Sequence, residues 1–373
     1  MDIATTLDDD VAARVATLVP WMQQRAAQLD AAAEFPVEEI AALHAAGALG
    51  LRLPAEAGVS PAEWSHALAD RMAVVLMQIG LGSLAVGRIV EAHINARHLI
   101  ARYGSPDQRT AAARSIRDGK LFALWVTDPP RNGLRMSVTS AGIRLTGGKM
   151  FCSAAGHATQ AVVTAENEDG AAQMLVVPLR GGERVEQLVA PLQGMRSAVT
   201  AAVDFDGCMV AEDACLGKPG DYMREPDFSG GAWRGSAVAL GGLCSIVALT
   251  QAQLAAADRI DSPHHLQRLG YVMIACETAR LWIQQAARTA EDPVADSDHA
   301  VAYVGLARIA IEAASLDAMR LAQRSLGLSA FRQGNPVERI CRDLSTYLRQ
   351  PAPDEVLTDA AAYFARQSAR QWP

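Results

Sequence analysis

The strongest constraint on the fold is a hydrophobic period that changes twice along the chain. Residues 12–118 carry apolar side chains at helical spacing, residues 120–216 alternate as strands do, and helical spacing then returns. Alanine, the best helix former, recurs in both helical parts, while aromatic residues make up only 5% of the 373 residues. The sequence therefore predicts a mostly α-helical protein with a central β domain, in the order N-terminal helical domain (1–119), small antiparallel β domain (120–216) and C-terminal helical bundle (217–373).

Helix boundaries are marked by capping signals. Ser105-Pro106 and Ser262-Pro263 each place a serine at an N-cap and a proline at the first helical position. After a stretch rich in glycine and proline, we expect five C-terminal helices, namely Trp233–Ala257, His264–Ala290, His299–Leu326, Pro336–Arg349 and Asp354–Arg370.

The central segment carries strand and hairpin signals. Asp169-Gly170 lies between two β-rich runs, which is typical of a hairpin turn. Val203 and Phe205 alternate with aspartates, so we expect these two side chains to face the core.

Charge and composition exclude several classes of partner. The net charge is −7 without a Lys/Arg cluster, which argues against nucleic acid and anionic membranes. The acidic N-terminus lacks the features of a signal peptide, and the most apolar stretch, Ala237–Leu249, is shorter than the ~20 residues of a membrane span. Six cysteines without a CxxC pair indicate free thiols rather than disulfides or a zinc site. We therefore expect a cytoplasmic protein without a metal centre.

Five phrases in a fixed order resemble the acyl-CoA dehydrogenase family over essentially the whole chain. Residues 102–121 match the phrase that follows that family's N-terminal helices, and "LFALWVTDPP" is similar to its strand ending in Val-Thr-Glu-Pro. The other three phrases are "LTGGKMFCSAAGHATQAVVTA", "CLGKPGDYM" and "GNPVERICRD". The resemblance implies FAD held between the β domain and the C-terminal helices, a small-molecule substrate such as an acyl-CoA, and assembly as a homodimer or tetramer.

The same resemblance implies particular cofactor contacts. Val126 and Thr127 match the donors that meet the pyrimidine edge of the flavin, where fixed donors stabilise negative charge. Ser153 matches a threonine whose hydroxyl approaches the redox-active edge, and Phe151 replaces a tryptophan beside the ring. Without the resemblance, Thr127 would be an ordinary strand end and Phe151 a core residue.

Contacts with a neighbouring subunit are implied by a second group of residues. Gln323 and Gly327 lie where the family has a Gln and a Gly that contact the partner's FAD, although their spacing is one residue longer here. Arg342 and Asp343 match an Arg-Asp pair, which we interpret as a structural ion pair.

Two departures concern ligand binding. Arg131, Asn132 and Arg135 replace small residues of the family, and they would form a polar substrate pocket in place of the usual thioester path. The family's Arg-x-x-Phe-Gly, which clamps the FAD diphosphate, has no counterpart. The shorter "DRIDSPHHLQRLG" retains Arg259 and Arg268 as possible anion partners. We expect its two adjacent histidines to form a solvated first turn, since adjacent residues of a helix cannot face one metal ion together.

The third and fourth departures concern the catalytic base. Pro351 stands where the family places the glutamate that removes the substrate's α-proton. An earlier position used by some relatives falls in "GGAWRGS", where Arg234 and its neighbours supply no carboxylate. Asp354 and Glu355 follow Pro351 by about one helical turn, or ~5 Å. We favour Asp354 as the cap of the last helix, and the alternative is that Asp354 or Glu355 is a displaced base.

Three functions remain open at this point. The first is an FAD-dependent oxidoreductase acting on an acyl thioester with a displaced base and an external electron acceptor. The second is a monooxygenase of the same fold that receives reduced flavin from a reductase and does not need the lost glutamate. The third is a non-catalytic subunit that completes a hetero-oligomer with an active paralogue.

Overall fold

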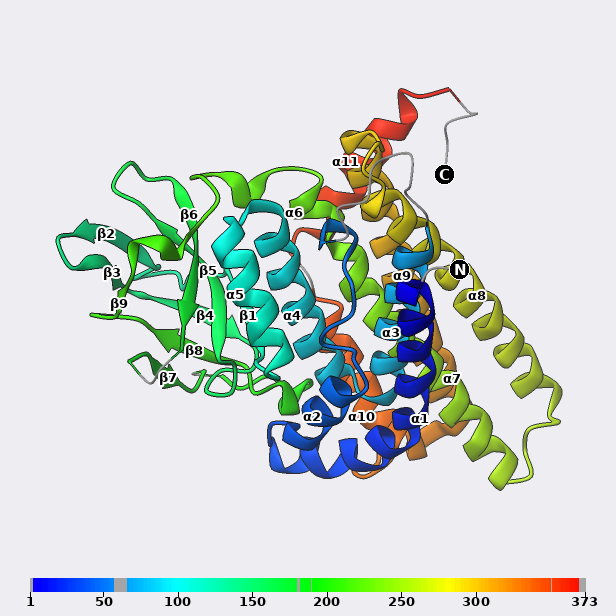
Figure 1. The fold of residues 1–373 in the computed structure, drawn as a ribbon. Coiled ribbons are helices and arrows are strands. Elements are labelled where there is room, and N and C mark those ends of the chain that lie inside the picture. Colours follow the sequence, from blue (N-terminus) through cyan, green and yellow to red (C-terminus); the bar gives the residue numbers. More distant parts are fainter. Residues whose placement is uncertain (1–2, 57–65, 180–181, 189, 350, 369–373) are drawn as a thin grey trace.

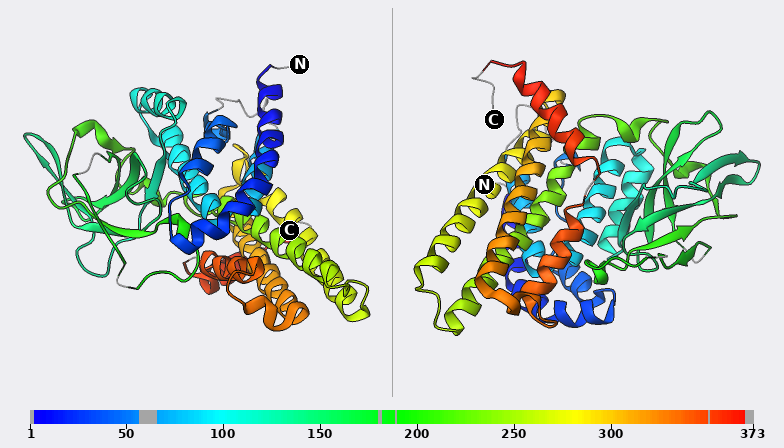
Figure 2. Two further views of the ribbon diagram at one scale, coloured as in Figure 1. Left: turned by 90° about the horizontal axis from the view of Figure 1, so that it is seen from below. Right: turned by 180° about the vertical axis from the view of Figure 1, so that it is seen from behind.

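The β-rich segment forms a module at one end of a helical bundle (Figures 1 and 2). This computed structural model describes residues 3–56, 66–179, 182–188, 190–349 and 351–368. The chain builds part of the bundle, crosses into the β module and returns to finish the bundle, so N- and C-terminal helices pack side by side. The predicted order of helical, β and helical parts is confirmed.

The N-terminal helices begin and end close to the sequence signals. Ser105 accepts a hydrogen bond from the Gln108 backbone N–H, and the Gln108 side chain accepts one from the Ser105 N–H, which forms a complete capping box. The bounds are α1 (Ile3–Ala32), α2 (Val37–Ala45), η1 (Pro54–Glu56), α3 (Ala67–Gly82), α4 (Leu84–Tyr103) and α5 (Pro106–Arg117).

The five predicted C-terminal helices are present, with one corrected end and one corrected cap. The last helix stops at Ala365 rather than Arg370, and it begins at Pro353, so Asp354 lies in its first turn instead of capping it. The bounds are η4 (Asp221–Met223), α6 (Asp227–Gly230), α7 (Ala232–Ala256), α8 (Pro263–Glu291), α9 (Ser297–Leu326), η5 (Gly327–Phe331), α10 (Pro336–Tyr347) and α11 (Pro353–Ala365).

Helices α3 and α7 cross at a contact that requires glycine on both sides. A Cβ at Gly80 would lie 2.1 Å from the Val238 carbonyl oxygen, and one at Gly241 would lie 2.1 Å from the Met77 carbonyl oxygen. This close approach joins the two halves of the bundle. Two stretches, Asp227–Ala256 and Ser297–Phe331, are apolar and long enough by composition to cross a membrane. Both include helices that pack inside the bundle, as expected for Ala237–Leu249.

The β module contains two sheets. Strands β10-β6-β5-β2-β3-β9 form one sheet, with β1 also paired to β5, and β4-β8-β7 form the other. The module is mostly antiparallel, but β1 runs parallel to β5, a pairing that the sequence did not predict. The bounds are β1 (Phe122–Trp125), β2 (Arg135–Thr139), β3 (Gly142–Thr146), β4 (Gly148–Cys152), β5 (Gln160–Glu166), β6 (Ala172–Pro178), β7 (Arg184–Glu186), η2 (Arg196–Ala198), β8 (Ala201–Asp204), β9 (Met209–Val210), η3 (Glu212–Ala214) and β10 (Cys215–Leu216).

Local strand predictions are confirmed. The Asp169-Gly170 turn joins β5 to β6, and Val203 and Phe205 are buried. Helices α4 and α5 cover the larger sheet through apolar contacts that include Leu99, Ile116 and Val162. Because α4 touches both the sheet and α7, it fixes the β module against the bundle.

Candidate active site

A large cavity lies between the β module and the helices that follow it. Its volume is about 930 Å³, which is within the range of small-molecule sites. Thr127, Phe151, Ser153 and Thr200 line it from the β module, and Cys341, Ser345, Thr346 and Tyr347 line it from α10. The remaining lining residues are Arg88, Leu192, Gln193, Met195, Ala198, Gln323, Ala330, Phe331, Glu338, Arg342, Arg349 and Pro351.

On the β-module side, a bulge turns an aromatic ring toward the cavity. The pairing of β4 with β8 shifts register between Lys149 and Cys152, and Phe151 within this bulge has a φ of 55°. Bulges re-aim side chains, and a positive φ at a bulky residue marks strain that is found mostly at functional sites. The Phe151 side chain is accordingly exposed on the cavity wall rather than buried in the core.

Two hydroxyls lie beside that ring. Ser153 is buried, its Oγ lies 3.4 Å from the Thr200 Oγ1, and its carbonyl accepts a hydrogen bond of 2.9 Å from the Trp125 indole. Both hydroxyls are cavity-lining and each can donate or accept. They give the wall a fixed polar edge.

A buried lysine holds the strand end that carries Thr127. The Lys149 ammonium is 1% exposed and donates to the Val126 carbonyl oxygen at 3.2 Å, to Asp128 Oδ1 at 2.7 Å and to Thr164 Oγ1 at 3.0 Å. The Thr127 carbonyl oxygen accepts a hydrogen bond from the Met150 N–H, which holds Thr127 against β4. All three ammonium hydrogens therefore have partners, and β4 is fastened on both sides of Thr127.

The segment 192–200, which forms another part of the wall, is pinned to α10. The Asp343 carboxylate accepts a 2.6 Å hydrogen bond from the Met195 N–H, and the Arg342 guanidinium donates to the Gln193 carbonyl oxygen at 2.7 Å. Burial raises the pKa of Asp343 to about 6, because desolvation outweighs the hydrogen bond from Met195 and the charge of Arg339.

The expected ion pair between Arg342 and Asp343 is wrong. Arg342 pairs with Asp30 at 2.8 Å and with Glu338 at 3.0 Å, whereas Asp343 faces Arg339 at 3.4 Å. Adjacent residues of a helix point about 100° apart, so the two side chains reach different partners.

Helix α4 brings a charged group to the cavity. The Arg88 side chain is 30% exposed, lines the cavity and donates a 2.5 Å hydrogen bond to Glu91. Burial is the largest single effect and lowers the pKa of Arg88, but Glu91 and the neighbouring tyrosines together raise it by more, so the net change is upward. The Arg88 guanidinium is therefore a cation at the cavity wall that pairs with one carboxylate, Glu91, among the described residues.

Tyr347 and Glu91 converge on Gly235 next to Arg88. A Cβ at Gly235 would lie 3.3 Å from the Tyr347 hydroxyl and 3.9 Å from the Glu91 carboxylate. Burial raises the pKa of Tyr347 well above its ordinary value, so its hydroxyl stays protonated. We call Arg88, Glu91 and Tyr347 the cavity cation site, in which the cation is the guanidinium of Arg88 itself.

Arg234, at the second position where relatives carry a base, is a buried hub. It is 3% exposed, donates to Asn95 Oδ1 at 3.1 Å, lies 3.1 Å from His98 Nδ1 and pairs with Glu291. Asn95 in turn donates to Glu91. Arg234 therefore supports the cavity cation site from behind instead of supplying a proton acceptor.

The predicted cofactor residues divide into two groups. The first group lines the large cavity and consists of Thr127, Phe151, Ser153 and Gln323. Val126 lies behind it and offers its carbonyl to Lys149, and Gly327 ends α9 with a φ of 62° outside the lining. These cofactor roles stay predictions.

The predicted substrate and base residues lie outside the lining. Arg131 is exposed, Asn132 accepts from the Gly148 N–H through its carbonyl, and Arg135 lies 3.5 Å from Glu166 across the sheet. Asp354 and Glu355 are exposed on the first turn of α11, while Pro351 lines the cavity. The carbonyl of Pro351 accepts from Arg308 at 2.6 Å.

Sequence reasoning missed the cavity cation site, although a signal for it exists. Arg88, Glu91, Asn95 and His98 recur at spacings of three and four residues along α4. That spacing places them on one face of α4.

Comparison with known proteins agrees with this architecture. Models of the acyl-CoA dehydrogenase N-terminal and C-terminal domains match residues 9–120 and 237–349. The chain belongs to the acyl-CoA dehydrogenase family. Among curated members, 3-sulfinopropanoyl-CoA desulfinase of Paraburkholderia xenovorans (strain LB400) is 25% identical over 364 residues, which cover 90% of each chain. The human mitochondrial short-chain specific acyl-CoA dehydrogenase is 26% identical over 213 residues, covering 52% of this chain and 49% of its own.

Two solved structures share the fold of this chain. Butyryl-CoA dehydrogenase of Megasphaera elsdenii has a TM-score of 0.84 at 16% identity, covering 96% of this chain and 98% of its own. FMN-bound TdsC of Paenibacillus sp. A11-2 has a TM-score of 0.84 at 16% identity, covering 95% and 96%.

Proposed function

We propose that this chain is a flavin-dependent enzyme that acts on an acyl thioester whose acyl group ends in an anion, and that it does so without removing an α-proton. The observation that carries the proposal is Arg88, a cavity-lining cation that pairs with one carboxylate among the described residues. Of the two positions where the family carries a base, one holds Pro351, which lines the cavity, and the other holds Arg234, which is buried behind it. The proposal replaces the displaced-base oxidoreductase as the favoured function, because Asp354 and Glu355 are exposed and outside the lining.

The residues of the β wall suit a flavin ring. Thr127, Ser153 and Thr200 supply hydroxyls, and Phe151 supplies a flat apolar contact held out by the bulge. A volume of about 930 Å³ leaves room for a ring system and part of a substrate. These residues would hold and orient a bound flavin, with Lys149 keeping Thr127 in place.

The proposed flavin is FAD or FMN. The family resemblance favours FAD, whereas the TdsC structure holds FMN, which lacks a diphosphate. Gln323 and Arg342 both line the cavity. Among the described residues, Arg342 already forms ion pairs with two carboxylates. Heat extraction of the purified protein followed by mass spectrometry distinguishes FAD from FMN directly.

The substrate class follows from charge. A guanidinium at a partly desolvated wall gains most from an anionic group that can accept two of its hydrogen bonds, such as a sulfinate or carboxylate. The relative of P. xenovorans is named for 3-sulfinopropanoyl-CoA, a short acyl thioester that ends in a sulfinate. Arg88 would take the anionic end of such an acyl group, and the Tyr347 hydroxyl lies beside it.

The reaction class follows from the missing base. Among the described lining residues the one carboxylate is Glu338, and Arg342 neutralises it at 3.0 Å. Without a free carboxylate to accept the α-proton, the general-base contribution of about 10²–10⁴ to ordinary dehydrogenation is lost. Replacing a sulfinate by hydrogen, with water consumed and sulfite released, requires no net oxidation and therefore no external electron acceptor.

The test compares two thioesters on the purified protein. We expect sulfite and propanoyl-CoA from 3-sulfinopropanoyl-CoA, measured by mass spectrometry, and no dye-coupled oxidation of butyryl-CoA. Arg88→Gln should lower kcat/KM for the sulfinate substrate at least about thirtyfold, because a desolvated charge partner is worth about 2–5 kcal/mol. Arg135→Gln, outside the lining, is the matched control. Oxidation of butyryl-CoA without any release of sulfite from 3-sulfinopropanoyl-CoA would overturn the proposal.

A second candidate is the monooxygenase of the same fold. The specific observation in its favour is a cavity wall rich in hydroxyls without a base, in a fold shared with the FMN-bound TdsC structure. Its signature would be an oxygenated product that forms only with a flavin reductase, NADH and air, and isotope from ¹⁸O₂ in that product identifies it.

We also propose that the chain forms homodimers or tetramers. Helix α8 exposes several large apolar side chains, namely Leu266, Tyr271, Met273, Ile274 and Leu281. Such a patch is typical of an interface. Light scattering of the purified protein measures the mass, and co-purification of a second, related chain would instead favour the hetero-oligomer.

A further inference from the structure

A buried histidine lies at the far end of the polar face of α4 from the cavity. His98 is 8% exposed, and its two ring nitrogens contact different groups. Nε2 lies 3.0 Å from Asp227 Oδ1, and Nδ1 lies 3.1 Å from Arg234 Nη2. A guanidinium only donates hydrogen bonds, so Nδ1 accepts and the ring proton is on Nε2, where the carboxylate accepts it. Two neighbours therefore fix one neutral tautomer of His98.

The carboxylate that sets this tautomer is itself held by donors on its other oxygen. The Tyr103 hydroxyl donates to Asp227 Oδ2 at 2.7 Å, and Arg102 Nε donates to the same oxygen at 3.3 Å. Burial would raise the pKa of Asp227, but the hydrogen bonds from His98 and Tyr103 and the charge of Arg102 together lower it by more, so the net change is downward. Asp227 is therefore ionised and accepts at both oxygens.

Arg234 connects His98 to the middle of α4. Its Nη2 meets both His98 and Glu291, and its Nη1 donates to Asn95 Oδ1 at 3.1 Å. A single contact with Glu291 would leave the guanidinium free to turn about that contact. Contacts on three sides fix its plane, and one of the three depends on an acceptor at His98 Nδ1.

The contacts continue from Asn95 to the cavity wall. Because the Asn95 oxygen accepts from Arg234, its Nδ2 is turned to donate to Glu91 Oε1, while Arg88 donates to Glu91 Oε2 at 2.5 Å. From His98 to Arg88 the path covers ten residues of α4, or ~15 Å. We call the following residues the buried polar network: Glu91, Asn95, Arg234, His98 and Asp227.

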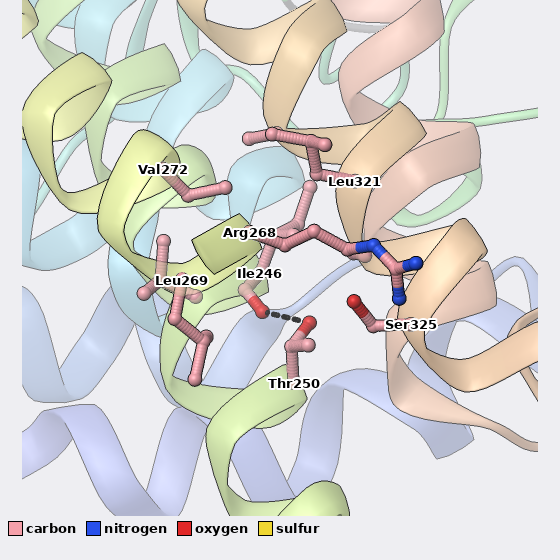
Figure 3. A pocket seen from close by; sticks show the side chains of 10 residues that line it. Ile246, Thr250, Arg268, Leu269, Val272, Leu321 and Ser325 are labelled. Atoms are coloured by element: carbon pink, nitrogen blue, oxygen red, sulfur yellow. Dashed lines mark hydrogen bonds between the residues drawn. The ribbon is translucent and has the colours of Figure 1, made fainter. Parts of the chain in front are cut away.

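The other buried histidines of the described residues have different surroundings. The ring nitrogens of His93 contact backbone groups. His265 lies beside two arginines and is 6% exposed, so the expectation of a solvated first turn is wrong for this residue. Figure 3 shows one of these arginines, Arg268, extending toward Ser325 across a pocket of about 10 Å³, which holds at most one water molecule. Among the buried histidines that the structure describes, His98 alone pairs with a carboxylate.

We propose that His98, held in one tautomer by Asp227, is a positioning residue that sets the orientation of Arg88 through the buried polar network. The proposal rests on the proposed function in taking Arg88 as the group that binds the anionic end of the acyl chain. If Arg234 turned away from His98, the Asn95 amide would lose the donor that fixes its orientation. Glu91 would then hold Arg88 in a less defined place.

The test measures a ratio of affinities rather than turnover. Succinyl-CoA and butyryl-CoA differ only in the terminal carboxylate, so titration calorimetry of the full-length protein with each thioester isolates recognition of the anion. A general loss of stability weakens both affinities alike and leaves the ratio unchanged. In the natural protein we expect succinyl-CoA to bind more tightly, because Arg88 lines the cavity.

Asp227→Asn changes the tautomer without changing the shape of the side chain. Tyr103 and Arg102 both donate to one oxygen of Asp227, so the asparagine oxygen should stay with them and its NH₂ should face His98. The ring proton then moves to Nδ1 and opposes the guanidinium of Arg234. ¹⁵N NMR of labelled histidine reads the tautomer directly, and the affinity ratio should fall about threefold to tenfold, as is usual for coupling within one hydrogen-bond network.

His98→Asn and His98→Gln form a matched pair. Asparagine places an acceptor near the position of Nδ1 and can serve Arg234, whereas glutamine places a donor near Nε2 and can serve only Asp227. The affinity ratio should stay within about twofold in His98→Asn and fall about threefold to tenfold in His98→Gln. Arg102→Gln is the control, because its side chain is 51% exposed and Tyr103 still holds Asp227.

Arg88→Gln separates this proposal from the proposed function. If the ratio falls in Arg88→Gln but is unchanged in His98→Gln and Asp227→Asn, the positioning role is overturned and the proposed anion site stands. The NMR signal of the Arg88 Nε–H, assigned by its loss in Arg88→Gln, reports the position of Arg88 without substrate. A shift of that signal in both network variants, with a ratio that Arg88→Gln does not change, would support the positioning role and overturn the proposed substrate class. Should Asp227→Asn fail to fold by circular dichroism, the two His98 variants decide alone.

Discussion

The two walls of the large cavity have diverged to different degrees. The β-module wall keeps two hydroxyls and an aromatic ring, at Thr127, Ser153 and Phe151, where the family resemblance implies flavin contacts. On the helical side, Pro351 lines the cavity and Arg234 is buried behind it, at the two positions where the family resemblance implies a carboxylate. One wall therefore preserves the kind of surface that holds a cofactor, and the other has lost the group that defines the usual reaction.

This difference indicates that cofactor binding and reaction type are carried by separable parts of the fold. The β wall is positioned by strand pairing and by Lys149, and the helical wall by α4, α7 and α10. We expect substitutions on the helical wall to change the chemistry without disturbing the β wall, since one fold can serve several reactions. Four predictions probe the two walls separately.

The largest effect is expected from returning a carboxylate to the helical wall. Pro351→Glu places a proton acceptor at a position that lines the cavity. If the rest of the site is intact, exchange of the α-proton of butyryl-CoA with D₂O should rise by about 10²-fold or more, as expected for a general base. Mass spectrometry of the recovered thioester measures the exchange, and Pro351→Ala is the control for the loss of proline alone.

An unchanged exchange rate in a folded Pro351→Glu protein would mean that the helical wall differs by more than its base. The comparison between the walls would then extend to substrate position, and the cavity cation site would be the first place to look.

The next effect concerns the segment that joins the two walls. The folded-state pKa of Asp343 is about 6, above the ordinary value of 3.8. Its contribution to stability is therefore complete below about pH 4 and is lost as the pH rises through about 6. From below pH 4 to pH 7 the natural protein should lose up to about 3 kcal/mol of stability relative to Asp343→Asn, and about 1.3 kcal/mol of this loss should fall between pH 5 and pH 7.

Urea unfolding of both proteins at several pH values measures this difference. The asparagine oxygen can still accept from the Met195 N–H, so the comparison isolates the charge. Parallel pH dependence of the two proteins would show that Asp343 titrates in the folded state as it does in the unfolded chain.

Local elements could be read from the sequence because their causes are local. The Ser105 capping box and the alternation at Val203 and Phe205 are properties of short segments, and both are present in the structure. The parallel pairing of β1 with β5, the ion pair of Arg342 with Asp30 and the hydrogen bond from the Met195 N–H to Asp343 join segments far apart in the chain. Those features were not predicted or were predicted wrongly.

The candidate site divides along the same line. Family motifs gave Thr127 and Ser153, and both line the cavity. The spacing of Arg88 and Glu91 on α4 can be seen in the sequence. Only the packing of α7 and α10 against that helix makes these residues part of a site. Asp354 was expected to cap α11, but the helix begins at Pro353, after an Ala352 with a φ of 51°.

A moderate effect is expected from the support of the β wall. Lys149→Met removes a buried ammonium and leaves the Val126 carbonyl and Thr164 without that donor. Unsatisfied buried groups cost about 1–3 kcal/mol, so unfolding in urea should begin earlier. Flavin affinity, measured by fluorescence quenching, should fall as well, because Thr127 loses its support. Lys120→Met, an exposed lysine just before β1, is the control. Reduced stability with unchanged flavin affinity would confine Lys149 to a structural role.

The smallest effects are expected at Asp354 and Glu355. Both side chains are exposed on the first turn of α11, outside the cavity lining, and Asp354 makes no capping hydrogen bond. Asp354→Ala and Glu355→Ala should each change turnover less than about twofold and stability by less than about 0.5 kcal/mol, as is usual for surface positions. Steady-state kinetics with the best thioester found for the natural protein checks this. A collapse of turnover in either variant would restore that residue as a displaced base, and it would mean that the helical wall moved its carboxylate rather than losing it.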